Sequence, residues 1–153
     1  MKLRTHAETV VLRAPAAAFD HATAGATLVR IAKALPPIPG ITGVEVEGEL
    51  RTGAVRHVRM TDGSVVDEDI LAHDAPTTHR YRWQKKPAFP FSLMVATGEG
   101  VWTFTPEGAG TKVAWDYEFD LTSPLAYPLA ALVLRRFEAW MQAGLEALRA
   151  ELA

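Results

Sequence analysis

The segment that most constrains the fold is KVAWDYEFD, residues 112–120, in which apolar and polar side chains alternate almost throughout. A repeat of two residues is typical of a β-strand with one buried face and one solvated face. The apolar positions are Val113, Trp115, Tyr117 and Phe119. The segment therefore predicts a strand whose inner face is mostly aromatic.

Short segments of the same kind fill residues 41–121. They are rich in valine, threonine and aromatic residues, and the turn sequences RTG, TDGS, DAPTT and PEGAG separate them. This pattern predicts an antiparallel meander. Upstream, Glu8 to Pro15 predicts a first strand. Helices are expected over AAAFDHATAG and over Thr27 to Leu35, where PPIPG ends the second one.

The last thirty residues return to a helical pattern. Ser123 is a good N-cap and Pro124 a good first helical residue, so we expect one helix from there to about Leu152. Pro128 is expected to remove one hydrogen bond near its start and to bend it. An apolar stripe at helical spacing needs an apolar partner, and the meander is the only candidate. The stripe consists of Leu129, Val133, Phe137, Trp140, Met141, Gly144 and Leu148.

The hairpin GAVRHVRMTDGSVVDEDI allows two registers. A two-residue Asp62-Gly63 turn would mix charge into an apolar face. A three-residue loop closed by Gly63 sends the neighbouring charges to the opposite face. Its apolar face then holds Ala54, Val58, Met60, Val66 and Ile70. We prefer this register, which sets Arg56 opposite Glu68 within the apolar face.

An Arg56–Glu68 pair on an apolar face needs an explanation, because burying two charges costs several kcal/mol per ion and their attraction returns only part of it. One interpretation places the pair at the partly wetted margin of the sheet, where it holds the strands in register. The other places both groups against a water-containing cavity, where an arginine can hold a polar group of a bound molecule. The sequence leaves both open.

Two further strands contribute aromatic side chains to the inner face. Tyr81 and Trp83 alternate with arginines in THRYRWQ, and Trp102 and Phe104 share one face of the segment before PEGAG. So many large side chains on one face require a strongly curved sheet, and curved sheets often leave space inside.

The turn before the aromatic strand is expected at Glu107-Gly108. It would place Gly98 opposite Tyr117 and Gly100 opposite Trp115. Small residues would then face large ones across the sheet, as is usual in packing.

Residues 85–95, KKPAFPFSLMV, are unusually apolar for a connecting segment. One hypothesis makes the segment a mobile apolar lip on a cavity, restrained by its two prolines. The lip would consist of Phe89, Phe91 and Met94. In the other hypothesis, Phe91, Leu93 and Val95 are the first inward residues of a buried strand.

Composition excludes several classes of function. With 16 basic and 18 acidic residues, the chain lacks the basic surface of a nucleic-acid-binding protein. It has no cysteine, its five histidines show no paired ligand spacing, and it contains no phosphate-binding fingerprint, so we expect no metal and no cofactor. The N-terminus lacks a signal-peptide core, and Leu125 to Leu134 is too short to span a bilayer. We expect one soluble, cytoplasmic domain over residues 1–153, whose oligomeric state stays open, a homodimer included.

The order of these elements resembles the helix-grip fold of the START-related, polyketide cyclase/dehydrase superfamily (SRPBCC): a strand, two short helices, a six-stranded meander and a long C-terminal helix. The segments that carry the resemblance are LRAPAAAFD at 12–20, GELRTGAVRHVRMTDGSVVDEDILAHD at 48–74, HRYRW at 79–83, FTPEGAGTKVAWDYEF at 104–119 and GLEALRAEL at 144–152.

The resemblance covers nearly the whole chain. It implies an α+β fold in which a strongly curved antiparallel sheet of about six to seven strands wraps around the C-terminal helix. It also implies a deep apolar cavity between sheet and helix, used across the superfamily for lipids, sterols, aromatic polyketides or hormones. It does not imply catalysis, since no shared catalytic motif exists.

Three functions are compatible with these observations. The first is the binding of a hydrophobic small molecule, such as a lipid, isoprenoid or polyketide, in the cavity. The second is an enzyme of the cyclase, aromatase or dehydrase type, in which Glu68 or Tyr81 transfers protons and Arg56 polarises a carbonyl. The third is an accessory protein that docks a partner or a membrane through an apolar surface at Leu125 to Leu134. The residues expected to contact a ligand are Arg56, Val58, Glu68, Ile70, Tyr81, Trp83, Phe89, Phe91, Trp102, Trp115, Tyr117, Val133, Phe137 and Trp140.

Overall fold

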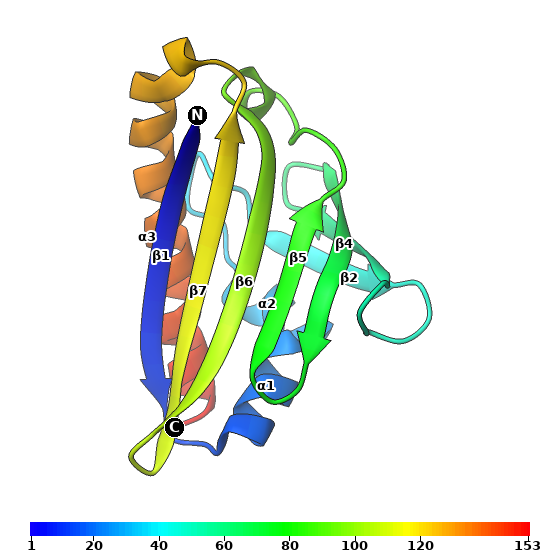
Figure 1. The fold of residues 1–153 in the computed structure, drawn as a ribbon, viewed down its shortest axis with the longest axis vertical. Coiled ribbons are helices and arrows are strands. Elements are labelled where there is room, and N and C mark those ends of the chain that lie inside the picture. The colour runs from blue at the N-terminus through cyan, green and yellow to red at the C-terminus, as the bar shows by residue number, and fades with distance from the viewer.

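The computed structural model describes residues 1–153 as one antiparallel sheet, two short helices and a long C-terminal helix (Figure 1). The strands lie in the order β1-β7-β6-β5-β4-β3-β2. They are β1 (Lys2–Val11), β2 (Ile41–Val46), β3 (Val55–Met60), β4 (Val65–Asp74), β5 (Thr78–Trp83), β6 (Val95–Glu107) and β7 (Gly110–Leu121). The helices are α1 (Pro15–Thr23), α2 (Gly25–Ile31) and α3 (Tyr127–Glu151), with short 3-10 helices η1 (Phe91–Leu93) and η2 (Pro124–Ala126). The α+β helix-grip architecture is confirmed.

The sheet wraps around one face of α3. In Figure 1, β1 runs along α3 with β7 and β6 next to it in the sheet, and β2 passes behind β4 and β5 in the same view. Helix α3 packs chiefly on β1, while α2 packs on both β2 and α3. The sheet therefore has a concave face, which it shares with the helices, and a convex face that no helix covers.

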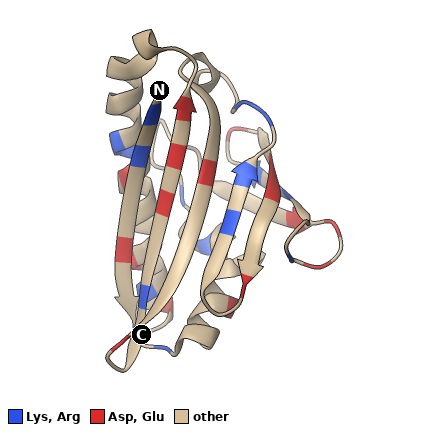
Figure 2. Cartoon of the chain, in the orientation of Figure 1, with Lys and Arg blue, Asp and Glu red and all other residues tan.

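The two faces separate by polarity as the alternation of β7 predicts. Trp115, Tyr117 and Phe119 are all at most 5% exposed and lie in one hydrophobic core. Figure 2 marks charged residues along β1, β7, β6 and β5, and those of β7 alternate with its buried aromatic residues. They pair across neighbouring strands, as Lys2 does with Asp120 at 3.0 Å. Exposed pairs of this kind contribute about 0–1 kcal/mol each, so the packing of the concave face holds the fold.

Two boundaries differ from those predicted. Strand β1 begins at Lys2, six residues before the expected Glu8, because the alternation of the chain continues upstream and β7 offers partners as far as Asp120. Helix α2 ends at Ile31 rather than Leu35. The Pro36-Pro37 pair explains this, since a proline disfavours helical backbone in the residue before it and cannot continue the helical hydrogen bonds.

The hairpin between β3 and β4 has the predicted register. Arg56 lies opposite Glu68 and Val58 opposite Val66, and Gly63 closes the loop with φ of 86°. That backbone region favours glycine because it has no Cβ.

The register of β6 on β7 was predicted wrongly by two residues. Glu107 pairs with Gly110, so the turn centres on Gly108 and Ala109, and Gly100 lies opposite Tyr117 while Gly98 lies opposite Phe119. The cause is Gly108, whose φ of 56° fits the first central position of a two-residue turn rather than the second. The inward orientation of Trp102 and Phe104 is as predicted.

The start of α3 also differs from the prediction. Ser123 caps the segment as expected, since its Oγ accepts from the Leu125 backbone N–H at 3.1 Å, but Pro124–Ala126 forms a 3-10 turn before α3. Pro128 falls in the first turn of α3, where backbone N–H groups have no intrahelical partner, so the expected loss of a hydrogen bond does not occur.

The buried stripe of α3 is shifted by one residue at its beginning. Ala130 and Leu134 are buried there, whereas Leu129 is 55% exposed and Val133 is only partly buried. The first turns of α3 rise above the ends of β1 and β7 (Figure 1), so few strand residues face them. From Phe137 onward the predicted stripe is buried. None of the helices has both the length and the apolar character needed to cross a bilayer.

Candidate functional site

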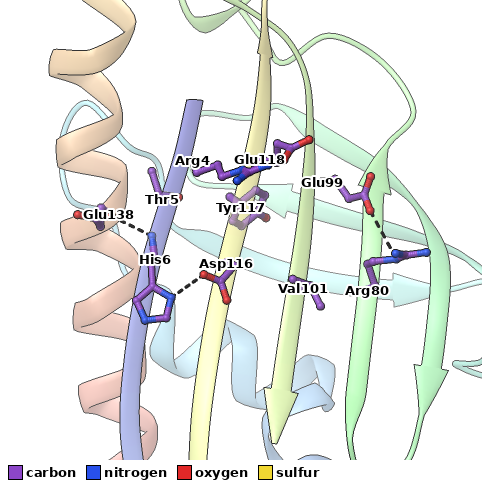
Figure 3. A pocket seen from close by; sticks show the side chains of 10 residues that line it. All are labelled: Arg4, Thr5, His6, Arg80, Glu99, Val101, Asp116, Tyr117, Glu118 and Glu138. Carbon is purple, nitrogen blue, oxygen red and sulfur yellow. Dashed lines mark hydrogen bonds and ion pairs between the residues drawn. The ribbon is translucent and has the colours of Figure 1, made fainter. Parts of the chain in front are cut away.

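A hollow of about 510 Å³ lies on the charged convex face (Figure 3). Its charged side chains already have partners. His6 contacts Asp116, Arg80 contacts Glu99, and Glu138 accepts from the backbone N–H of His6 at 2.8 Å. Because these groups pair with one another, they leave no set of free groups directed at a ligand, and we place the candidate site on the concave face instead.

Two smaller cavities lie between the concave face and α3. The outer cavity, nearer the surface, has a volume of about 80 Å³ and a mainly hydrophobic lining. The tip of the β3–β4 hairpin, the loop over residues 36–40 and the segment 87–91 surround it. Met60, Val66, Trp83 and Phe137 contribute to its walls.

The inner cavity, of about 40 Å³, lies deeper along the same strands. Strands β3, β5 and β7 line both cavities with inward residues that lie two positions apart. The outer cavity is lined by Met60, Trp83 and Phe119, and the inner cavity by Val58, Tyr81 and Tyr117. The ring of Phe137 lies at this boundary, and its centroid is 5.0 Å from that of the Tyr117 ring and 5.2 Å from that of the Phe119 ring. Aromatic side chains therefore divide one apolar region into two compartments.

Arg56 and Glu68 lie in the wall of the inner cavity, 3% and 5% exposed. The guanidinium Nε donates to the carboxylate oxygen Oε1 at 2.8 Å, and Nη2 forms an ion pair with the same oxygen at 2.7 Å. Burial raises the pKa of Glu68 above its ordinary value, while the adjacent guanidinium acts in the opposite direction. The pair is thus fully buried and lines a cavity, rather than lying at the wetted margin of the sheet.

A histidine chain extends this pair. Nη1 of Arg56 lies 3.2 Å from Nε2 of His79, and Nδ1 of His79 lies 3.0 Å from Nδ1 of His73. Because arginine only donates, Nε2 of His79 accepts, and Nδ1 carries the proton that it donates to His73. Burial lowers the pKa of His79 to about 2, and Arg56 and His73 act in the same direction. His79 is therefore neutral at ordinary pH.

Three aromatic polar groups form a second network. The Trp115 Nε1–H donates to the Tyr81 hydroxyl at 3.1 Å, and Tyr81 donates to the Tyr117 hydroxyl at 2.7 Å. Burial raises the pKa of both tyrosines, so both stay protonated at neutral pH. The Arg56 guanidinium lies 5.0 Å from the centre of the Tyr81 ring, a favourable cation–π position.

The segment over residues 85–95 combines features of both hypotheses. Phe89 is 75% exposed and Phe91 lines the outer cavity, as a lip would require. Met94 and Val95 are buried, so Met94 does not belong to the lip. Phe91–Leu93 forms a 3-10 turn with Leu93 exposed, so no buried strand begins there.

The structure gathers most of the predicted ligand contacts at the two cavities. Those at the inner cavity are Arg56, Val58, Glu68, Tyr81, Trp102, Trp115, Tyr117 and Trp140. Those at the outer cavity are Trp83, Phe91 and Phe137. Ile70, Phe89 and Val133 line neither cavity. Whether any of these residues contacts a ligand stays a prediction.

Sequence reasoning missed His79 and Leu134. A signal for His79 was present, because it shares the inward positions of THRYRW with Tyr81, but it was considered only as a metal ligand. No local pattern could have chosen Leu134 over Val133, since the choice depends on where the α-helical geometry of α3 begins.

Comparisons with known proteins agree with this architecture. The family model described as "Polyketide cyclase / dehydrase and lipid transport" matches residues 2–153. No curated protein matches the chain.

Solved structures with the same fold include three that differ in origin. The di-domain ARO/CYC StfQ from the steffimycin biosynthetic pathway has a TM-score of 0.73 at 16% identity, over 99% of this chain and 51% of that chain. Mll3558 from Rhizobium loti has a TM-score of 0.70 at 17% identity, over 99% and 98%. TTHA0849 from Thermus thermophilus has a TM-score of 0.69 at 20% identity, over 98% and 97%. At these identities the likeness shows the shared fold.

Proposed function

Because the chain belongs to the polyketide cyclase/dehydrase and lipid transport family, we propose that it binds a hydrophobic small molecule between the concave face and α3. The observation that carries the proposal is the outer cavity, whose walls are mainly apolar although it lies near the surface. Such a lining favours ligands that gain free energy by leaving water. We propose that the chain acts as one domain, since a single core takes in residues from the sheet and all three α-helices.

The present cavities are small for a ligand of drug-like size, which occupies a site of about 300–1,000 Å³. At about 80 and 40 Å³, each holds only part of such a molecule. Movement of Phe137, whose ring stands between the compartments, would join them into one site. Displacement of Phe91 and its neighbours would open that site outward. We therefore propose a closed resting state that widens around its ligand.

Arg56 has a more limited role in this proposal than the sequence suggested. Two of its five N–H groups donate to Glu68 and His79, and its Nη2 also forms an ion pair with Glu68. Its charge is balanced by the carboxylate beside it. We infer that the pair mainly fixes the polarity of the inner cavity, so that the ligand faces a wall without net charge.

The enzyme hypothesis remains a second candidate. Glu68 favours it, because this carboxyl lines the inner cavity and burial raises its pKa, as is common for groups that transfer protons. The likeness to a di-domain ARO/CYC is compatible with it. The variant Glu68→Gln separates the candidates: an enzyme loses turnover while it retains binding, whereas a binding protein changes only its affinity.

The accessory-protein hypothesis has its own observation. Leu125, Leu129 and Leu132 are 91%, 55% and 64% exposed on η2 and the start of α3. If this surface carried the function, replacing these leucines with serine would abolish it, while variants that fill the cavity would leave it intact.

Ligand binding is tested by native mass spectrometry of the purified protein, followed by organic extraction of any retained molecule. The proposal expects a stoichiometric apolar adduct, or its uptake from a panel of lipids and polyketides. A protein that stays unliganded throughout that panel contradicts it.

A further inference from the structure

Trp140 carries a buried donor without an acceptor. Its side chain on α3 is 5% exposed and lines the inner cavity, with its ring 5.4 Å from Trp115 and 5.1 Å from Phe137. No protein group accepts from its Nε1–H, and it is the only buried side-chain nitrogen or oxygen without a hydrogen bond. Buried tryptophan N–H groups usually have a partner, because leaving one unpaired costs free energy.

A second donor in the same cavity is also free. Tyrosine has a single O–H proton, and the Tyr81 hydroxyl already accepts from Trp115 and donates to Tyr117. Tyr117 therefore accepts through its oxygen, and its own proton has no acceptor among the hydrogen bonds of the protein. Reversing the bond between the tyrosines would only move the free proton to Tyr81.

Arg56 engages two of the nearby acceptors. Its Nε donates to Oε1 of Glu68 and its Nη1 to Nε2 of His79, while its Nη2 forms an ion pair with the same Oε1. The opposite charges of Arg56 and Glu68 cancel, so the wall does not compensate an anionic ligand group, which would be costly to bury. The inner cavity thus offers neutral donors to a group that needs only to accept.

On the premise that the cavity binds an apolar molecule, as proposed above, we propose that its ligands are neutral carbonyl compounds with an aromatic or otherwise apolar body. The carbonyl oxygen accepts from Trp140 Nε1–H and from the free hydroxyl of the tyrosine pair. The body packs against the aromatic walls and reaches into the outer cavity when Phe137 moves. A ketone, quinone or ester has this chemistry. A carboxylate lacks a counter-charge here.

The test compares acetophenone with ethylbenzene, which share a phenyl ring and a two-carbon substituent and differ by the ketone oxygen. The protein has four tryptophans, so four indole N–H signals are expected in a ¹⁵N–¹H spectrum, and Trp140→Phe identifies one of them. Acetophenone should move the Trp140 signal downfield, as a new hydrogen bond does, and ethylbenzene should not. Acetophenone should also bind about fivefold or more tightly than ethylbenzene.

Variants separate the hydrogen bonds from the packing. Trp140→Phe keeps an aromatic ring but removes the indole donor, so it should reduce the preference for acetophenone severalfold. Tyr117→Phe removes one hydroxyl but frees the proton of Tyr81, so it should reduce that preference less than Trp140→Phe does. Two results would overturn the carbonyl assignment but not the binding cavity. One is equal affinity for ethylbenzene and acetophenone, and the other is a variant that lowers the affinity for both compounds equally. If neither compound binds, the carbonyl assignment is overturned as well. Lipid and polyketide uptake then decides the proposed function separately.

Discussion

The ring of Tyr81 covers Gly100, its partner across β5 and β6, so closely that a Cβ on the glycine would lie 2.5 Å from the Tyr81 Cζ. No real Cβ tolerates that separation. The missing side chain of Gly100 therefore lets the Tyr81 ring lie flat on the sheet and reach Tyr117 with its hydroxyl.

Gly100→Ala should consequently displace Tyr81 and break its hydrogen bond to Tyr117. We expect the free energy of unfolding to fall by about 1–3 kcal/mol, as in other overpacked cores. Urea unfolding measures the change. Gly43→Ala is the matched control, because a Cβ there would meet Arg59 at an ordinary 3.6 Å, and we expect a loss of about 0.5 kcal/mol or less. Equal losses for both variants would contradict this account.

Removing one member of the Arg56–Glu68 pair should cost more than removing both. Glu68→Gln leaves a buried arginine without its counter-charge, and we expect a loss of about 3–5 kcal/mol. The double variant Arg56→Met/Glu68→Met should recover most of that loss, because two apolar side chains of similar size need no charge partner. Denaturant unfolding of the two proteins decides the point, and a double variant no more stable than Glu68→Gln would show that the pair does not act as a unit.

The buried His79 should make stability depend on pH. In the unfolded chain it binds a proton below its ordinary pKa of 6.5, whereas in the folded protein it does so only near 2. Between these values the unfolded state binds more protons, so the free energy of unfolding should fall as pH falls below 6.5, by up to about 1.4 kcal/mol per pH unit.

The variant His79→Gln isolates this effect, since it keeps an acceptor for Arg56 but does not titrate. Between pH 6.5 and 5 its stability should change less with pH than that of the wild type. His6 and His57 on the convex face have raised pKa values, so their contribution is lost as pH rises above 6.5 and does not interfere in this window. Identical slopes for both proteins would contradict the assignment of His79.

The segment Pro87–Leu93 should open more readily than the sheet. Phe89 and Leu93 are exposed, and no strand pairs with the segment. Hydrogen exchange should show its amides among the fastest, while the amides of β6 and β7 exchange slowly. If the segment closes over a bound ligand, adding that ligand should slow the hydrogen exchange of the segment. Protection equal to that of β7 would rule out a lip.

The sequence predicts those parts of the fold and site that depend on local alternation. Period-two patterns place Tyr81, Trp115 and Tyr117 on the concave face, and the cost of a mixed-charge face selects the register that pairs Arg56 with Glu68. Features that depend on the backbone conformation of a single residue or turn could not be predicted from alternation. The position of Gly108 in its turn shifted the β6–β7 register, and the 3-10 turn before α3 moved the buried stripe from Val133 to Leu134.

The size of the cavities and the unpaired Trp140 Nε1–H could not be predicted either. Both follow from how side chains from four or more elements fill the space between sheet and helix, which no local pattern records. The cytoplasmic location remains a prediction from the sequence.

The most direct test of the account compares Val66→Phe with Val65→Phe. Val66 lines the outer cavity, whereas its neighbour Val65 is 47% exposed and does not line it. The added ring should fill the cavity in the first protein and point away from it in the second. We predict that native mass spectrometry finds an apolar adduct, retained or taken up from the ligand panel, on the wild type and on Val65→Phe, and at least tenfold less on a folded Val66→Phe. Equal loading of all three proteins would contradict binding in this cavity.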